Sequence, residues 1–512
     1  MQQTFKYGKE TLTYEKAMQL ANGLLEGIID QDTTAKIEAS AALTQKLAEG
    51  NQAVYGINTG FGPLCTTKIA GKDTAQLQHN LLMSHSVGIG ENVPIVISKL
   101  MLVTKLQALS QGYSGIQLDT LKRIQWLLKE GIIPVVPSKG SVGASGDLAP
   151  LSHLFLPLIG LGKVWFNNEI YDTSVVLEQK EVEPLTLRPK EALALINGTQ
   201  FIASYAVLFL HTFHNILELA DVISALSLEG FQGSVNPFTQ ALHDLRPFEG
   251  NLLVAKRMRN LLEGSDIVTS HKNCDRVQDP YSIRCIPAVH GASRNAWKHL
   301  KEITEIELNA VTDNPIILED GQSISGGNFH GQPLAIPLDY ACVAAAEIGS
   351  ISERRSYLML EGKFGLPTML IKDGGLHSGF MIPQYTAAAL VSENKGLCFP
   401  ASCDSIPTSL GQEDHVSMGS ISGRKAQQVA QNVTFILAIE LLYALQAIDY
   451  RRPSTSSELL EKVHSFLREK IDHVESDRIF SDDINILQQL IVDGTLLNLV
   501  NRQALLLNVE LN

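Results

Sequence analysis

The chain has 512 residues, of which 45% are hydrophobic and 19% are charged. This length and composition support a large apolar core. They exclude a mainly disordered protein and favour two domains, or one domain with a long helical body. The formal net charge of −13 disfavours nucleic acid and anionic membranes as partners, because both attract Lys and Arg. A small-molecule enzyme is the favoured class.

The cysteines and the apolar segments bear on the compartment. Six cysteines are few for this length and form no Cys-x-x-Cys pair, which favours reduced thiols. His271 and Cys274 are three residues apart, but no second pair of ligands follows at metal-binding spacing, so we predict no metal site. Residues 1–14 lack the apolar core of a secretory signal, and the longest apolar stretch, Leu151–Phe166, is too interrupted to span a bilayer. We expect a cytoplasmic protein without a membrane partner.

The first two hundred residues alternate short helical patterns with Gly-rich segments. Within them, the region from Lys163 to Thr186 has strand-forming character and predicts a small hairpin. The residues that give it this character are Val164, Trp165, Val175 and Val176.

Three long helical patterns with few breakers follow: Ala203–Glu229, Leu338–Leu360 and Arg424–Arg451. They are apolar on more than one face, which predicts burial against several neighbouring helices. We therefore predict a mainly α fold. An N-terminal α-rich domain with functional loops would span residues 1–202, and a long-helix bundle would span residues 203–512.

The Gly-rich segment Gly140–Pro150 is the strongest candidate for chemistry. It lacks the Gly-Lys-Ser/Thr ending of a phosphate loop. Its second glycine comes one position too early for the G-x-S-x-G elbow of a serine hydrolase. A structural Gly-rich turn stays open, and so does autocatalytic cyclisation of Ala144-Ser145-Gly146.

Cyclisation explains the residue types. The amide nitrogen of Gly146 attacks the carbonyl carbon of Ala144, and two waters leave, one with the Ser145 hydroxyl. The product is a 4-methylidene-imidazol-5-one, which is an electrophile. Gly146 has no Cβ, so its nitrogen approaches closely in a strained turn, and Ala144 is small enough to permit the compression. Asp147 is a candidate for assisting proton transfers.

The Ala-Ser-Gly-Asp-Leu segment resembles the signature of the histidine and aromatic amino acid ammonia-lyase family. Four further motifs stand in the family's order along nearly the whole chain: Tyr55–Gly62, Ala194–Thr199, Val277–Cys285 and Gly326–Gly331. The resemblance implies a fumarase/aspartase-like architecture and a homotetramer whose active sites draw residues from more than one subunit. It also implies an electrophile made from Ala144-Ser145-Gly146, with no external cofactor.

The resemblance implies catalytic roles for three further residues. Tyr55, on a mobile inner loop, would take the β-proton of the substrate. Asn197 would hydrogen-bond near the electrophile and the substrate. Tyr281 would lie beside the electrophile and assist the amine or ring step.

Three other residues would bind the substrate by the same resemblance. Arg284 would bind the substrate carboxylate, for which a bidentate guanidinium is suited and an ammonium is not. Gln278 would orient the bound amino acid, and Phe329 would line the pocket.

Two positions favour histidine as the substrate. Ser84-His85 resembles the Ser-His pair of the family's histidine branch. Glu413 stands where that branch has a carboxylate facing the imidazole. A buried imidazole needs partners for both nitrogens, and His85 and Glu413 would supply them while rejecting phenylalanine. The expected reaction converts L-histidine to trans-urocanate and ammonia, the first step of histidine degradation.

Departures from the family pattern keep alternatives open. His290 stands where the family usually has Met, and Leu410-Gly411 stands where Ala-Asn is common. A tyrosine or phenylalanine ammonia-lyase, or an aminomutase on the same scaffold, is the near alternative. A serine hydrolase using Ser145 and a non-catalytic helical scaffold are the distant ones.

Overall fold

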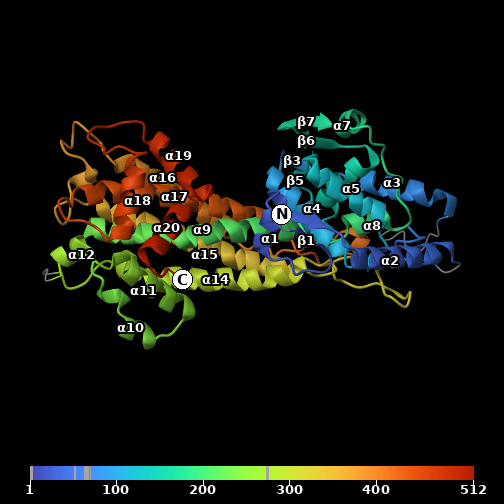
Figure 1. Cartoon of the computed structure of the whole chain (residues 1–512), viewed down its shortest axis with the longest axis horizontal. Helices are drawn as coiled ribbons and strands as arrows, with labels where there is room; N and C mark the ends of the chain where they lie inside the picture. Colours follow the sequence, from blue (N-terminus) through green and yellow to red (C-terminus); the bar gives the residue numbers. More distant parts are fainter. Residues whose placement is uncertain are drawn as a thin grey trace. The chain divides into compact units, whose positions relative to one another are not determined.

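In the computed structural model, the described residues are 4–50, 53–60, 62, 69, 71–272 and 276–511. They are mainly helical, as the sequence predicts, and Figure 1 shows them in chain order from blue to red. The chain forms two compact units. The first contains Met1–His211, Leu300–Asp339 and Pro400–Arg424, and the second contains Thr212–His299, Tyr340–Phe399 and Lys425–Asn512. The predicted division is a single cut after residue 202, whereas the chain returns twice to the first unit.

The first unit is built on short and medium helices. They are α1 (Tyr14–Ala21), α2 (Gln31–Glu49), α3 (Thr74–His85), α4 (Ile95–Leu109), α5 (Leu118–Lys129), α6 (Leu148–Phe155), α7 (Thr173–Gln179) and α8 (Glu191–Ile196). Helix α4 is buried on all sides from Leu100 to Leu109 and contacts α1, α5 and α6. Its sequence is apolar all round, which is typical of a helix at the centre of a core. It carries one lysine, Lys105, into that core.

Short strands fix the loops of this unit. β1 (Thr4–Lys6) pairs in parallel with β2 (Glu26–Ile28). The antiparallel pairs are β3 (Ile89–Asn92) with β5 (Pro137–Lys139), β4 (Ile133–Pro134) with β6 (Lys163–Phe166), β6 with β7 (Glu169–Asp172), and β8 (Ile316–Ile317) with β9 (Ser323–Ile324).

The predicted hairpin is confirmed as β6 and β7, but its extent is wrong. Val175 and Val176 lie in helix α7, where Thr173, Val176 and Leu177 are buried. Burial at this helical spacing overrides the strand preference of valine.

The long helices have most of their length in the second unit. They are α9 (Gln200–Phe231), α14 (Ile286–Leu308), α15 (Gln332–Met359) and α17 (Gly419–Asp449). The shorter helices are α10 (Gln240–Asp244), α11 (Glu249–Leu262), α12 (Asp266–Ser270), α13 (Tyr281–Arg284), α16 (Met381–Leu397), α18 (Glu458–Arg468), α19 (Phe480–Val492) and α20 (Thr495–Leu507). Among the described residues, 3-10 turns occur in both units. The first unit contains η2 (Gly71–Asp73), η3 (Leu156–Ile159) and η6 (Ser409–Gly411), and the second contains η4 (Asn236–Phe238) and η5 (Thr368–Leu370).

The three predicted long helices are present as α9, α15 and α17. Helix α15 begins before the predicted start, because Pro337 lies inside it rather than ahead of it. Small residues bring the helices close together. A Cβ on Gly230 of α9 would lie 2.7 Å from Ala447 of α17, and one on Gly349 of α15 would lie 3.0 Å from Ile436 of α17.

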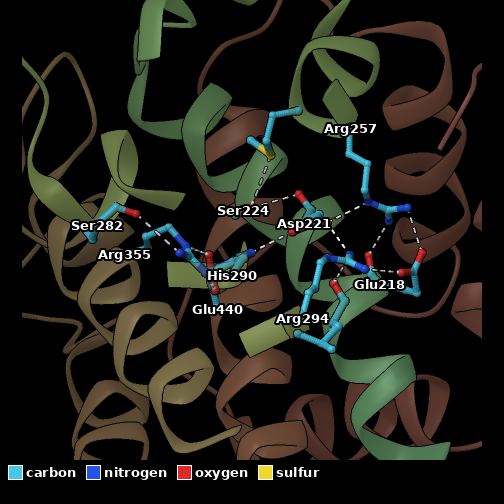
Figure 2. A network of polar contacts seen from close by, with 11 residues as sticks. Glu218, Asp221, Ser224, Arg257, Ser282, His290, Arg294, Arg355 and Glu440 are labelled. Carbon is cyan, nitrogen blue, oxygen red and sulfur yellow. Dashed lines mark hydrogen bonds and ion pairs between the residues drawn. The ribbon is translucent and has the colours of Figure 1, made fainter. Parts of the chain in front are cut away.

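A buried network of charges ties the helices of the second unit together (Figure 2). The Asp221 carboxylate of α9 accepts hydrogen bonds from Arg257 Nε at 2.7 Å and from Arg294 at 2.6 Å, and it lies 2.8 Å from His290 Nδ1. Glu218, one turn earlier, pairs with the same two arginines at 2.8 and 2.7 Å. Each buried charge therefore has opposite charges around it, as burial requires.

Arg355 of α15 and Glu440 of α17 form a second buried pair in the network, with Arg355 NH2 2.9 Å from the Glu440 carboxylate. Arg355 also donates to the Ser282 carbonyl of α13 at 3.4 Å. His290, at the position where the family usually has Met, is thus part of the structural network, through Asp221.

Three helices, α9, α15 and α17, are long and apolar enough to cross a membrane by length and composition, and α19 with α20 would pass together despite a 60° bend. Within the protein, 72%, 67% and 89% of the three apolar windows are buried. These three helices, and not the interrupted stretch Leu151–Phe166, are the long apolar helices among the described residues. The apolar residues of these helices serve packing inside the protein.

Candidate active site

A cavity of about 590 Å³ in the first unit brings together four of the predicted site residues: Tyr55, His85, Ser145 and Glu413. Most of the remaining wall is apolar and comes from α3, α6 and α8, and its residues include Leu77, Leu81, Leu148, Leu193 and Ile196. The polar side chains that line it besides the predicted ones are Asn80, Ser84 and Ser409. An apolar cavity of this size with a few convergent polar groups is typical of a small-molecule site.

The segment at Ser145 is a strained turn. Gly143, Ser145 and Gly146 have positive φ values of 88°, 48° and 84°. A Cβ on Gly146 would lie 2.1 Å from the Gly198 carbonyl oxygen, so only glycine fits here. Asp147 N donates to that oxygen at 2.8 Å, and Gly198 N donates to the Ser145 carbonyl oxygen at 3.2 Å.

A second segment holds the same turn from the other side. Met418 N donates to the Val142 carbonyl at 3.0 Å, and Ser420 Oγ donates to the Ser141 carbonyl at 2.7 Å. A Cβ on Gly143 would lie 2.2 Å from Ser417 Oγ. The turn is thus compressed between residues 198 and 417–420. Compression, a left-handed serine and an obligatory glycine fit the requirements of cyclisation by Ala144-Ser145-Gly146.

Asp147, directly after the turn, is fully buried without a cationic partner among the described residues. Its carboxylate accepts from Ser141 Oγ and from Ile202 N, each at 3.0 Å. Burial raises the pKa of Asp147 to about 7, against the opposing effect of these hydrogen bonds. The carboxyl group can therefore gain or lose a proton near neutral pH beside the turn.

Glu413 is held by two hydroxyl groups that the sequence analysis missed. Its Oε2 accepts from Ser409 Oγ at 2.6 Å and from Thr408 Oγ1 at 2.9 Å, while its Oε1 lies 3.4 Å from Ser145 Oγ. The loop closes through Thr408 N to the Glu413 carbonyl at 2.9 Å. Oε2 is thus occupied by two donors, and Oε1 is directed toward the cavity.

The loop before Glu413 is also strained. Ser409, Leu410 and Gly411 have φ values of 52°, 56° and 87°. Left-handed serine and leucine in succession are uncommon and persist where the surroundings demand them. The unusual Leu410-Gly411 pair was visible in the sequence as a departure from the family. This departure pointed to the loop, but it did not indicate that the hydroxyl groups of Thr408 and Ser409 hold the Glu413 carboxylate.

His85 ends helix α3, and its Nδ1 lies 3.0 Å from Ser84 Oγ. Burial lowers the pKa of His85, while the Leu81 carbonyl and the Glu413 charge act in the opposite direction. A neutral imidazole results, which offers one donor and one acceptor nitrogen. Such a group can bind a polar ring in the cavity.

Tyr55 lies in a turn and is half-buried at the cavity wall. The next residue, Gly56, has a φ of 71°, and a Cβ there would lie 2.3 Å from Leu193, so the turn packs tightly on α8. Phe61 of the same motif lies outside the described residues.

Asn197 and Phe329 belong to the first unit but do not line the cavity. Asn197 Nδ2 donates to the Asn314 carbonyl at 2.8 Å, while its buried Oδ1 has no hydrogen-bond partner among the described residues. Phe329 is half-buried, and Gly331 beside it lies against Ser417, where a Cβ would come within 2.9 Å of Oγ.

Gln278, Tyr281 and Arg284 belong to the second unit. Tyr281 begins α13 with 71% of its surface exposed, and the Arg284 guanidinium carbon lies 4.5 Å from the centre of its ring. The buried Arg284 Nε has no hydrogen-bond partner among the described residues. Gln278 is exposed and lines a separate polar cavity of about 330 Å³.

No group of three His, Cys, Asp or Glu side chains in the described part of the chain is placed to hold a metal ion. Of the pair weighed in the sequence analysis, Cys274 lies outside the described residues. Both ring nitrogens of His271 face backbone carbonyls, of Ile267 at 2.8 Å and Gly233 at 2.9 Å.

Comparison with known proteins shows similarity along nearly the whole chain. Residues 12–469 match the sequence profile of the aromatic amino acid lyases. Histidine ammonia-lyase of Natranaerobius thermophilus is 43% identical over 497 residues, which cover 96% of each chain. The crystal structure of histidine ammonia-lyase from Trypanosoma cruzi is 41% identical, with a TM-score of 0.90 over 98% of this chain and 95% of that chain. Tyrosine aminomutase from Streptomyces globisporus is 34% identical, with a TM-score of 0.92 over 98% of each chain.

Proposed function

The chain belongs to the aromatic amino acid lyase family, and we propose that within it the protein removes ammonia from L-histidine to give trans-urocanate. One observation carries the choice of substrate: Glu413 and His85 line the same cavity as Ser145. The shared name of relatives that are 43% identical over 96% of their length supports the same choice.

We propose that Ala144, Ser145 and Gly146 cyclise to a 4-methylidene-imidazol-5-one. Once formed, this group supplies an electrophile for the α-amino group or the ring of the substrate. The strained turn and the close approach of Gly146 to Gly198 support its formation at this place. Asp147 is the group beside the turn with a pKa suited to exchanging the protons that cyclisation moves.

The cavity residues then have distinct tasks. Glu413 Oε1 accepts a hydrogen bond from one imidazole nitrogen of the substrate, and His85 pairs the other. The apolar wall excludes water, which strengthens both contacts. Tyr55 is the base that takes the β-proton, and Asn197 hydrogen-bonds near the reacting groups.

The remaining predicted residues bind the rest of the substrate. Arg284 binds the carboxylate, Gln278 orients the amino acid and Tyr281 lies beside the electrophile. Phe329, which does not line the cavity of the single chain, lines the substrate pocket of the assembled enzyme. From the family resemblance we expect a cytoplasmic homotetramer in which each site draws residues from more than one subunit.

The test is a parallel assay of the purified protein with L-histidine, L-tyrosine and L-phenylalanine. Ultraviolet absorbance follows the unsaturated product, and ammonia is measured in the same samples. We expect urocanate and ammonia from histidine alone. A cinnamate-type product would overturn the role of His85 and Glu413, and a β-amino acid would identify an aminomutase.

A substitution of Glu413 tests directly whether its place in the cavity determines the substrate. Glu413→Gln should lower kcat/KM for histidine about a hundredfold, because the charge that pairs the imidazole is lost. Assembly should be unaffected. Unchanged turnover in this variant would contradict the proposed pocket.

A further inference from the structure

A fully buried lysine lies behind the reactive turn without a counter-charge. Lys105 of α4 is 1% exposed. Its ammonium group donates to the Asn197 carbonyl, and it lies 3.4 Å from the amide oxygen of Gln200. No carboxylate in the described part of the chain lies within ion-pair distance of it. Lys190, the other fully buried lysine of this unit, has an ion pair with Asp313 at 2.5 Å.

Burying a cation on neutral acceptors alone is unfavourable, since the interactions lost with water are only partly replaced. Burial lowers the pKa of Lys105 to about 7, with Asp313 and Asp147 raising it and Lys190 lowering it further. A buried lysine of this kind destabilises the fold, so its presence indicates a functional role at a nearby site.

A peptide group connects Lys105 to the turn. The carbonyl of Asn197 and the amide N–H of Gly198 belong to the same peptide. Lys105 donates to the oxygen of this peptide. The N–H of the same peptide, on Gly198, donates to the Ser145 carbonyl oxygen at 3.2 Å. A cation at the oxygen of an amide polarises the group and makes its N–H a stronger donor.

The peptide is fixed in place by its neighbours. Gln200 Nε2 donates to Thr312 Oγ1 at 2.8 Å. Gly198 has a φ of 120°, and a Cβ on it would lie 2.6 Å from both the Gln200 amide oxygen and Thr312 Oγ1. These contacts fix the orientation of the Gly198 N–H toward the Ser145 carbonyl oxygen.

The Ser145 carbonyl is the acceptor whose charge changes during reaction. After cyclisation it is conjugated with the methylidene carbon. When a nucleophile forms a bond to that carbon, the π electron pair moves onto the Ser145 oxygen, which then takes a proton from water. A donor aimed at this oxygen stabilises the charge as it develops.

We propose that Lys105 is a positioning residue that activates the electrophile through the Asn197–Gly198 peptide. The inference rests on the ring of the proposed function but does not depend on which amino acid is the substrate. Lys105 touches neither substrate nor ring. It acts by strengthening the hydrogen bond from Gly198 to the Ser145 oxygen.

The test measures electrophile reactivity without any amino acid. Full-length wild-type protein, Lys105→Gln and Lys105→Met are compared by intact mass, which gives the fraction of chains that have lost two waters. Cyanide is then added, and the rate of adduct formation per ring-bearing chain is followed by mass. Lys105→Gln keeps an N–H donor without the charge, so it isolates the contribution of the cation.

We expect the adduct rate to fall roughly tenfold in Lys105→Gln and further in Lys105→Met, less than the effect of removing a direct donor. Arg294→Met is the control. It removes a buried cation that pairs with Glu218 and Asp221 in the second unit, so it should lower the Tm but leave the adduct rate per ring unchanged.

An unchanged adduct rate in both Lys105 variants would overturn the inference, even if histidine turnover fell. If neither variant forms the ring, Lys105→Arg, which keeps the charge, is measured in the same way. An adduct rate per ring-bearing chain close to that of the wild type supports the inference, and a rate roughly tenfold lower overturns it. The proposed function fails separately, when wild-type protein binds cyanide but does not turn over histidine.

Discussion

Asp147 and Asp221 are both fully buried, yet their surroundings shift their pKa in opposite directions. Asp147, in the first unit, accepts from the Ser141 hydroxyl and from backbone amides of residues 201 and 202, and burial raises its pKa to about 7. Asp221, in the second unit, is similarly desolvated, but Arg294, His290 and Arg257 hold its pKa well below the usual range.

The difference distinguishes the ion-paired carboxylate of the helical network from the carboxyl group beside the turn. In the second unit, Asp221 forms ion pairs with Arg257 and Arg294, whereas the buried Glu229 has hydroxyl partners and burial raises its pKa to about 7. In the first unit, neither Asp147 nor Lys105 has a close ion-pair partner among the described residues, and both have pKa values of about 7. Lys190 and Asp313 show that the first unit also contains a buried ion pair.

The largest expected effect is at the turn itself. Ser145→Ala removes the hydroxyl that must leave during cyclisation, so turnover should fall by at least about a thousandfold. The Tm should stay close to that of the wild type, and the intact mass should show both waters retained. Substantial turnover in this variant would show that the reactive group lies elsewhere.

The next effect is on stability. Arg294→Met leaves Asp221 and Glu218 short of a partner in a buried place, which should lower the free energy of unfolding by about 3–5 kcal/mol. Activity per folded chain should be unchanged. Lys363→Met, at an exposed pair with Glu361, is the control and should change stability by less than about 0.5 kcal/mol. Loss of activity in folded Arg294→Met protein would break the division between the two regions.

A smaller effect should follow from the hydroxyl groups behind Glu413. Ser409→Ala frees Oε2 of the carboxylate from one donor and loosens its orientation. We expect kcat/KM for histidine to fall about tenfold, with ring formation and Tm unchanged.

Leu410→Ala is the control in the same loop, because the Leu410 side chain is 95% exposed, and it should behave as the wild type. Combining Ser409→Ala with Thr408→Val should bring the loss closer to that of Glu413→Gln. Equal effects of Ser409→Ala and Leu410→Ala would show that the loop contributes through its backbone conformation and that the Ser409 hydroxyl is not needed.

The smallest effect is a pH dependence. Because the pKa of Asp147 is raised in the folded state, ionising it disfavours the fold. This contribution to stability declines as pH rises from about 4 and is fully lost once pH has passed the folded pKa of about 7. Asp147→Asn removes the titration. Its stability relative to the wild type should therefore rise by about 1 kcal/mol between pH 6 and pH 8. A difference that does not vary with pH would show that Asp147 does not titrate in this range.

The sequence predicted what depends on local pattern. The long helices α9, α15 and α17 follow from long runs with few breakers, and Ser145 with its glycines follows from the chemistry that those residue types permit. Tyr55, His85 and Glu413 were found through motifs, and the cavity brings them together with Ser145.

What escaped prediction depends on contacts distant in the chain. The segment Ile95–Leu109 contains Lys99 and Lys105, and nothing in its pattern tells which lysine is buried. The partner of Lys105 is the carbonyl of Asn197, 92 residues later. The hydroxyl groups of Thr408 and Ser409 were missed for a different reason. They act only because three left-handed residues turn the loop back on Glu413.

The contacts of residues 417–420 with the turn have a consequence for the order of synthesis, folding and maturation. The peptide from Ser141 to Gly146 is synthesised long before Ser417 and Ser420, which compress it. A nascent chain therefore carries an ordinary, unreactive serine peptide until most of the protein has emerged from the ribosome and folded. If cyclisation needs this compression, as the proposed function holds, maturation would be a late step. Each new molecule would then spend an interval complete in length but without its electrophile.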